Sequence, residues 1–326
     1  MPKVACTALS TDEGPHLEIF TKAGFEVSFP PPGVNCFNED HLITVLQDCD
    51  AVVAGSEPYT RRVISSLPKL RVIARRGVGF DAVDLAAADD HNIAVATTPG
   101  VLDESVAEHT IAMLLACARG FPSLDRQVRE GRWLRAVYPR AAGKTLGIVG
   151  LGRIGQAVVP KAQGIGMQVI AYDPFPNHEF AKKHNVEFTT LDDLLARSEF
   201  VSLHLAMSPE SFNLINKNTL AKMQRGAILI NTGRGQLINE DDLCEALKSG
   251  QLAAAGLDVF QKEPLPLTSP LLQLDNVLLS GHIAGLDKES NYDIAARFAE
   301  TILTLYRGGW PAECIRNLKG RANWKF

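Results

Sequence analysis

Three polar side chains follow strand-like runs in the second half of the chain. Arg234 comes shortly after the run ILIN, Glu263 after LDVF and His282 after VLLS. In a parallel sheet the carboxyl ends of the strands meet at one edge, which is also where open α/β sheets bind ligands. We therefore expect the three loops to converge on one site.

These three residue types suit the transfer of a hydride to a 2-oxo acid. An arginine offers a planar fork to a carboxylate and can polarise the adjacent carbonyl. A histidine can give a proton to the carbonyl oxygen, and a neighbouring glutamate favours the protonated imidazole and fixes its orientation. Each residue also has an ordinary interpretation: Arg234 as a solvated arginine, Glu263 as a turn residue before a proline, and His282 as a structural histidine.

A glycine-containing stretch, residues 144–173, predicts the cofactor that supplies the hydride. A strand-like run is followed by Gly150, Gly152 and Gly155 at the G-x-G-x-x-G/A spacing, and then by a helical pattern. The helix N-terminus would present free N–H groups to a pyrophosphate. Asp173 ends the next strand-like run, where a carboxylate binds ribose and repels a 2′-phosphate, which favours NAD over NADP. The alternative is a glycine turn that binds no nucleotide.

A second loop that could bind a ligand has the sequence RRGVGFD. It begins at Arg75, directly after a strand-like run. Its glycines allow backbone N–H groups to face a carboxylate. The alternative is a tight β-to-α turn with solvated arginines. In the same way, Arg75, Arg76 and Arg135 either bind a substrate phosphate or form a solvated basic cluster.

Strand-like and helical segments alternate along most of the chain, which indicates parallel sheets covered by helices. We predict the fold class α/β with two doubly wound parallel-sheet domains. Residues 1–103 would begin the substrate domain, residues 104–289 would form the NAD-binding domain, and residues 290–326 would return to the first domain. A mostly apolar helical stretch at residues 104–132, broken near Gly120 and Pro122, belongs either to the core or to a subunit interface, so a homodimer is one possibility.

The composition is that of a globular protein with about two domains. The chain has 326 residues, of which 46% are hydrophobic and 21% charged, and its formal net charge of −4 does not indicate a nucleic-acid or membrane surface. The six cysteines are scattered singly, with no histidine cluster at zinc spacing, which predicts reduced thiols and no metal site. We find neither a signal peptide nor a membrane-spanning run, so we expect a cytoplasmic enzyme or binding protein.

The remaining histidines are weaker candidates for a role in catalysis. We expect His109, inside the apolar helical stretch, to lie in the core or at an interface, and His204, at the end of a strand, to line the cofactor site. The others stand in polar or helical surroundings and are expected at the surface: His16, His41, His91, His178 and His184.

Together these motifs make the sequence resemble the D-2-hydroxyacid dehydrogenases, especially their phosphoglycerate dehydrogenase-like and glyoxylate/hydroxypyruvate reductase-like members. The resemblance covers nearly the whole chain. It rests on RRGVGFDAVD from Arg75, SVAEHT from Ser105, GLGRIG from Gly150, the acid Asp173, INTGRG from Ile230, GLDVFQKEP from Gly256 and GHIAG from Gly281.

The resemblance implies a Rossmann NAD-binding domain inserted into a flavodoxin-like substrate domain, with D-stereospecificity and a dimer. It implies that Arg234 binds and polarises the substrate, that Glu263 pairs with His282, and that His282 is the acid/base. Backbone groups around Val78 and Gly79 would bind the substrate carboxylate. Cofactor contacts beyond the three motif glycines are implied at Arg153, Ile154, Asp173, Thr232 and Asp258.

The sequence also departs from the family pattern. HLAMS from His204 replaces the usual H-x-P-x-T, and Gly281 stands where a proline usually precedes the catalytic histidine. Residues 286–288 differ as well, which leaves the identity of the substrate open. Glu263 occupies the position of a glutamine in the related formate dehydrogenases, which argues against formate.

We therefore predict an oxidoreductase that transfers a hydride between NAD(H) and a small D-2-hydroxy acid or 2-oxo acid. Its substrate would belong to the 3-phosphoglycerate, glycerate/hydroxypyruvate or glyoxylate class. The alternative is an NAD(H)-sensing, co-repressor-like binding protein with little turnover. Several 2-oxo acids of these classes, and both directions of the reaction, are compatible with the sequence.

Overall fold

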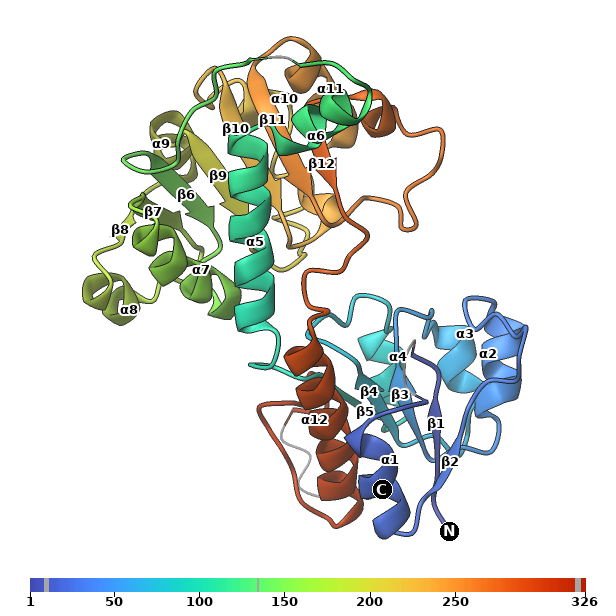
Figure 1. The fold of residues 1–326 in the computed structure, drawn as a ribbon. Helices are drawn as coiled ribbons and strands as arrows, with labels where there is room; N and C mark the ends of the chain where they lie inside the picture. Colours follow the sequence, from blue (N-terminus) through green and yellow to red (C-terminus); the bar gives the residue numbers. More distant parts are fainter. Residues whose placement is uncertain (9–11, 134, 320–323) are drawn as a thin grey trace. The chain divides into compact units, whose positions relative to one another are not determined.

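The structure is a computed structural model that describes residues 1–8, 12–133, 135–319 and 324–326. The chain forms two compact units (Figure 1). The first consists of Met1–Leu102 and Asp287–Phe326, and the second is the intervening segment Asp103–Leu286. The chain thus leaves the first unit once and returns to it at the end.

The first unit contains five parallel strands in the order β2-β1-β3-β4-β5. They are β1 (Lys3–Cys6), β2 (Glu26–Ser28), β3 (Ala51–Ala54), β4 (Val72–Arg75) and β5 (Ala94–Ala96). Its helices are α1 (Pro15–Lys22), α2 (Glu39–Leu46), α3 (Arg61–Ser65), α4 (Leu85–Asp90) and α12 (Lys288–Tyr306). The inner strand β3, with the sequence AVVA, is buried at every residue, as expected for a parallel sheet covered on both faces.

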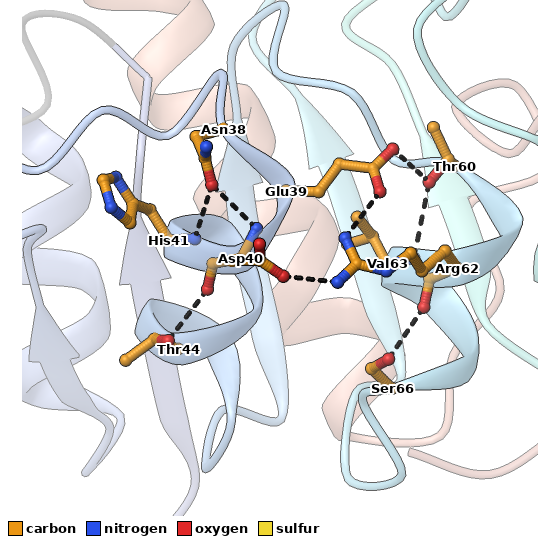
Figure 2. A network of polar contacts seen from close by, with 9 residues as sticks. All are labelled: Asn38, Glu39, Asp40, His41, Thr44, Thr60, Arg62, Val63 and Ser66. Carbon is orange, nitrogen blue, oxygen red and sulfur yellow. Dashed lines mark hydrogen bonds and ion pairs between the residues drawn. The ribbon is translucent and has the colours of Figure 1, made fainter.

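Helices α2 and α3 are joined at the surface by a network of polar side chains (Figure 2). Asn38 caps the N-terminus of α2 and Thr60 caps that of α3, each through its side-chain oxygen. Arg62 forms ion pairs with Glu39 and Asp40 of the neighbouring helix. A side-chain cap typically contributes about 1 kcal/mol, whereas exposed ion pairs of this kind contribute less.

One acidic side chain of the first unit is buried without a full set of partners. Glu57 lies on the loop after β3 and is only 3% exposed. Within the part of the chain that the structure describes, its Oε2 atom has no hydrogen-bond partner. Burial raises the pKa of this carboxyl, and the backbone N–H of Glu57 and the charge of Arg75 offset only part of the increase.

We expect Glu57→Gln to stabilise the protein at pH 8 by about 1–2 kcal/mol, because a neutral amide avoids burying a charge. At pH 3, below the ordinary glutamate pKa of 4.5, the wild-type carboxyl is protonated in both folded and unfolded states, so the gain should be small. As the pH rises through the elevated folded-state pKa, the wild type loses stability and the variant does not. Melting temperatures across this range test the prediction. Glu26→Gln, at a side chain that is 53% exposed, is the control, and an equal gain at both pH values would contradict the account.

The prediction that His16 lies at the surface is wrong. His16 is fully buried in α1, and its ring packs against the rings of Phe20 and Phe298 with centroid separations of 6.4 and 5.2 Å. Helix α1 packs against α12, which comes from the other end of the chain, so the local sequence does not reveal this contact. The other predicted surface histidines are exposed, except for His184, which is partly buried.

The second unit contains seven parallel strands in the order β12-β11-β10-β9-β6-β7-β8. They are β6 (Thr145–Val149), β7 (Gln168–Tyr172), β8 (Glu187–Phe188), β9 (Phe200–Leu203), β10 (Ala227–Asn231), β11 (Leu252–Leu257) and β12 (Val277–Leu279). Its α-helices are α5 (Asp103–Ala118), α6 (Phe121–Arg129), α7 (Arg153–Gly164), α8 (His178–Lys183), α9 (Leu191–Arg197), α10 (Lys217–Leu220) and α11 (Glu240–Lys248).

Both strand orders are those of doubly wound folds, flavodoxin-like in the first unit and Rossmann-like in the second. The predicted fold class is therefore confirmed. Two small elements, α8 and the two-residue edge strand β8, were not predicted. The predicted helical stretch 104–132 is divided into α5 and α6 at Gly120, which has a left-handed φ of 62°.

Helix α5 lies along strands β10 and β11 of the second sheet (Figure 1). Its side chains Met113, Leu114 and Cys117 are buried in a core cluster that also contains Ile148 and Ile230. These apolar residues therefore belong to the core of the unit. Large apolar side chains are exposed instead on α6 and just beyond it: Phe121, Val128, Trp133 and Val137.

Other features of the described residues bear on the compositional predictions. None of their helices combines the length and the apolarity needed to cross a membrane. All six cysteines are buried free thiols. Within the same residues, no group of three or more metal-ligating side chains is close enough together to hold a metal ion.

Candidate active site

The three motif glycines form the turn between β6 and α7. Gly150 has a φ of 101°, and a Cβ atom there would lie 2.6 Å from the backbone nitrogen of Leu205, so a side chain does not fit. A Cβ on Gly155 would overlap the carbonyl oxygen of Gly150, whereas one on Gly152 would meet nothing within 4 Å. The first and third glycines thus allow the turn and the close helix packing, and the second leaves an open face that a pyrophosphate can approach.

Asp173 follows β7 and lies beside this turn. Its Oδ2 accepts a hydrogen bond from the N–H of Leu151 at 2.7 Å, and its Oδ1 accepts one from the N–H of Phe175 at 2.8 Å. The carboxylate is thus held in place and keeps lone pairs for hydroxyl donors. The open face at Gly152 and this fixed acid together fit the pyrophosphate and ribose of NAD.

Two other predicted cofactor contacts begin helix α7. Arg153 and Ile154 stand in its first turn, where free N–H groups favour an anion. The Arg153 side chain is 66% exposed, and its Nε donates a hydrogen bond to Asp103 at 2.8 Å. Thr232 follows β10 on the same edge of the sheet, and its hydroxyl lies 2.9 Å from that of Thr110 in α5.

His204 follows β9 at the same edge, next to the glycine turn. A Cβ on Gly150 would lie 2.7 Å from the carbonyl carbon of His204. The His204 imidazole is hydrogen-bonded through Nε2 to the hydroxyl of Ser202 at 2.8 Å. Burial lowers the pKa of the imidazole to about 4, so the ring is neutral at physiological pH. The prediction that it lines the cofactor site remains a prediction.

His282 and Glu263 are hydrogen-bonded, with 2.7 Å between His282 Nδ1 and Glu263 Oε2. Glu263 Oε1 accepts the N–H of Phe260 at 2.9 Å. Burial tends to raise the pKa of Glu263, but the hydrogen bonds from His282 and Phe260, together with the charges of His282 and Arg234, lower it overall. The carboxylate therefore stays ionised and accepts a hydrogen bond from the Nδ1–H group, which leaves Nε2 to exchange a proton with a substrate.

Arg234 lies between β10 and the short 3-10 helix η1 (Gly235–Leu237). Its Nη1 donates to the carbonyl of Gly233 at 2.8 Å, and its own carbonyl accepts the side-chain amide of Asn231 at 2.9 Å. The loop passes so close to the next one that a Cβ on Gly235 would overlap the carbonyl group of Phe260. The glycine thus allows the loop of Arg234 to lie against the loop of Glu263.

In the first unit, Val78 and Gly79 lie on the loop after β4. The Nε of Arg75 donates to the carbonyl of Gly79 at 3.1 Å, and the N–H of Thr98 donates to the carbonyl of Gly77 at 2.9 Å. The loop is therefore anchored at the carboxyl edge of its own sheet, where a ligand is expected.

The three arginines considered for a substrate phosphate lie in different surroundings. Arg75 is half-buried and bonds to the loop just described, and Arg76 donates a hydrogen bond to Asn291 of α12. Burial lowers the pKa of Arg76. Arg135 is exposed in the second unit. The arginines at 75 and 76 are thus already engaged by protein groups.

A family model described as the D-isomer specific 2-hydroxyacid dehydrogenase NAD binding domain matches residues 111–284. The chain belongs to this family. It is 41% identical over 281 residues to the glyoxylate reductase of Korarchaeum cryptofilum, an alignment that covers 84% of this chain and 85% of the relative. It is 39% identical over 274 residues to the D-3-phosphoglycerate dehydrogenase of Archaeoglobus fulgidus, which covers 83% of this chain but only 52% of that longer relative.

Among solved structures, the D-lactate dehydrogenase of Aquifex aeolicus, complexed with NAD and lactic acid, resembles this dehydrogenase with a TM-score of 0.82 and 28% identity. The match covers 94% of this chain and 96% of that one. The chain is therefore an NAD-dependent oxidoreductase that acts on the CH–OH group of small D-2-hydroxy acids. The comparisons support this prediction and not the alternative of an NAD-sensing binding protein.

Asp258 holds the loop that carries His282 in place. Its side chain is almost completely buried, and it accepts hydrogen bonds from the Ser280 hydroxyl at 2.6 Å and from the N–H groups of Ile283 and Ala284, both at 2.9 Å. Its backbone carbonyl accepts the N–H of His282 at 2.7 Å. The resemblance implies only a cofactor contact for Asp258, and this structural role is not predicted by it. An acid at the end of one strand, beside a polar residue at the end of the next, was the available signal.

Gly235→Ala should lower kcat/KM of the dehydrogenase by about tenfold or more, because the added methyl group overlaps the Phe260 backbone and separates the loops of Arg234 and Glu263. Gly164→Ala is the matched control, since a Cβ at this position in α7 meets nothing within 4 Å. Steady-state kinetics and melting curves of both variants provide the test. Normal kinetics for Gly235→Ala would show that the close approach of the loops is not required.

Proposed function

We propose that the enzyme interconverts an unphosphorylated 2-oxo acid, of the glyoxylate or hydroxypyruvate class, with the corresponding D-2-hydroxy acid. NAD(H), when bound, supplies or accepts the hydride. The main observation in support of the proposal is the 2.7 Å hydrogen bond between His282 and Glu263. It leaves the second ring nitrogen of an oriented imidazole available as the proton donor to the carbonyl oxygen.

Arg234 binds the substrate in this proposal. Its guanidinium would hold the carboxylate and polarise the adjacent carbonyl, which is to become the alcohol. The charge of Arg234 lowers the pKa of Glu263, which supports a position of Arg234 near the hydrogen-bonded pair of Glu263 and His282. The N–H groups of Val78 and Gly79 are proposed to bind the substrate carboxylate, in keeping with their position after β4.

We propose an unphosphorylated substrate because of the hydrogen bonds that Arg75 and Arg76 already make. Arg75 and Arg76 donate hydrogen bonds to Gly79 and Asn291, so binding a phosphate would require these bonds to be exchanged. The name of the Korarchaeum relative, glyoxylate reductase, also supports an unphosphorylated acid.

A substrate panel tests the proposal. Purified enzyme is mixed with NADH and, separately, with glyoxylate, hydroxypyruvate, its 3-phosphate and pyruvate, and the loss of NADH absorbance is followed. We expect the highest kcat/KM with glyoxylate or hydroxypyruvate, and a much lower value when NADPH replaces NADH, because Asp173 repels a 2′-phosphate. Highest activity with the 3-phosphate would contradict the substrate class, and no turnover with any acid would contradict the reaction.

We also propose that the enzyme is a cytoplasmic homodimer. Exposed apolar side chains on α6 and the segment after it support a second copy of the chain as the partner: Phe121, Val128, Trp133 and Val137. Buried, unpaired cysteines are typical of a reducing compartment. Light scattering on the wild type and on Trp133→Glu should give a dimer and a weakened dimer, whereas a wild-type monomer would refute the assembly.

A further inference from the structure

A second histidine of the NAD-binding unit is connected to the catalytic loop. His109 lies in α5, and its Nε2 is 3.1 Å from the hydroxyl of Ser280. The same hydroxyl lies 2.6 Å from Oδ1 of Asp258. His109 Nε2 is itself 3.7 Å from Asp258 Oδ1, so the three side chains form one compact cluster.

The direction of the hydrogen bonds follows from the chemistry of the groups. The Asp258 carboxylate accepts, so the Ser280 hydroxyl must donate its single proton to it. The hydroxyl then accepts from His109, which places a proton on His109 Nε2. The chain of donors thus runs from histidine through serine to aspartate. This direction differs from that of a hydrolase triad, in which the serine gives its proton to the histidine.

The cluster includes or contacts residues on both sides of His282 in the sequence. Ser280 stands two residues before His282, and the N–H groups of Ile283 and Ala284 donate to the same Asp258 carboxylate at 2.9 Å. His282, which lies between Ser280 and Ile283, has a left-handed φ of 55°. This conformation is unfavourable for residues other than glycine, so it needs support from its surroundings. The carboxylate and the hydroxyl supply that support.

We propose that His109 is a positioning residue for His282: by donating to Ser280, it fixes the hydroxyl on Asp258 and so holds the loop of residues 280–284 in the conformation that catalysis requires. The inference rests on the proposed function insofar as it assigns acid/base chemistry to His282. Among the hydrogen bonds of the described residues, those of His109 go to neither His282 nor Glu263, so it acts on them through the loop. Its effect should therefore fall on kcat more than on the affinity for NADH.

Four variants test the proposal in the full-length enzyme. His109→Ala and Ser280→Ala should each lower kcat by about tenfold, the equivalent of one hydrogen bond, with less than about a threefold change in the Kd for NADH. The double variant should be no worse than the poorer single variant, because both changes break the same chain of hydrogen bonds. In His109→Gln the side-chain amide can still donate to Ser280, so kcat should recover to within about threefold of the wild type.

His178→Ala, at an exposed histidine of the same unit, is the matched control and should behave as wild type. Multiplicative losses in the double variant, or equal losses in His109→Ala and His109→Gln, would overturn the proposal. So would a His109→Ala variant with wild-type kcat.

Hydrogen exchange of the protein without substrate separates this inference from the proposed function. In His109→Ala, the amides of Ile283 and Ala284 should exchange about tenfold faster than in the wild type, while amides of the distant strand β7 remain unchanged. Unchanged exchange at these two amides would refute the positioning role even if the enzyme reduces 2-oxo acids. Faster exchange in a protein that reduces none of them would refute only the proposed function.

Discussion

Replacing His282 with alanine is expected to lower kcat for reduction of the preferred 2-oxo acid by about 10²–10⁴-fold. The imidazole, hydrogen-bonded to Glu263, is the group that we propose delivers a proton to the carbonyl oxygen. Binding of NADH should change little, because the glycine turn and Asp173 lie on other loops. Steady-state kinetics and a fluorescence titration with NADH measure the two quantities.

His41→Ala, at an exposed histidine of the first unit, is the control for this prediction. Its kcat should equal that of the wild type. If His282→Ala retained more than about a tenth of the wild-type kcat, proton transfer would have to come from another group. A parallel loss of NADH binding would point to a collapsed loop, which a melting curve and hydrogen exchange would reveal.

The second large effect is expected at Arg234. Arg234→Ala should lower kcat/KM by about 10²–10³-fold, because it removes the proposed partner of the substrate carboxylate and the charge proposed to polarise the carbonyl. Arg234→Lys restores the charge but not the planar fork, so we expect it to recover only part of the loss. The kinetics of the two variants, measured with the same acid, distinguish charge from geometry.

Arg225→Ala provides the comparison, since this arginine is exposed and donates a hydrogen bond to the carbonyl of Ser249, outside the proposed site. It should leave kcat/KM unchanged. Full activity of Arg234→Lys would show that a point charge suffices, and full activity of Arg234→Ala would remove the residue from the site.

The sequence was sufficient to predict the fold class because its signals are local. Gly150, Gly152 and Gly155 mark a turn whose geometry depends on the absence of side chains. The structure shows a steric reason for the glycine at Gly150 and at Gly155, whereas Gly152 leaves an open face. The strands are short apolar runs separated by helical patterns, a combination that leaves few alternatives to a parallel sheet. The same reasoning placed Arg234, Glu263 and His282 at the ends of neighbouring strands.

What the sequence could not predict depends on contacts between distant segments. The buried ring of His16 packs against Phe298, which lies near the other end of the chain. The close approach of Gly235 to Phe260 and the hydrogen bonds of Asp258 to Ile283 likewise arise only when separate loops meet. The edge strand β8 is two residues long and gives no periodic signal.

We expect hydride to pass directly to the 2-carbon of a 2-oxo acid, on the face that gives the D-hydroxy acid. NADH deuterated at its transferable position, mixed with hydroxypyruvate and the wild-type enzyme, tests it most directly. We expect D-glycerate with one deuterium on its second carbon, identified by mass spectrometry and chiral chromatography. Glycerate without deuterium at that carbon, or the L-enantiomer, would contradict it.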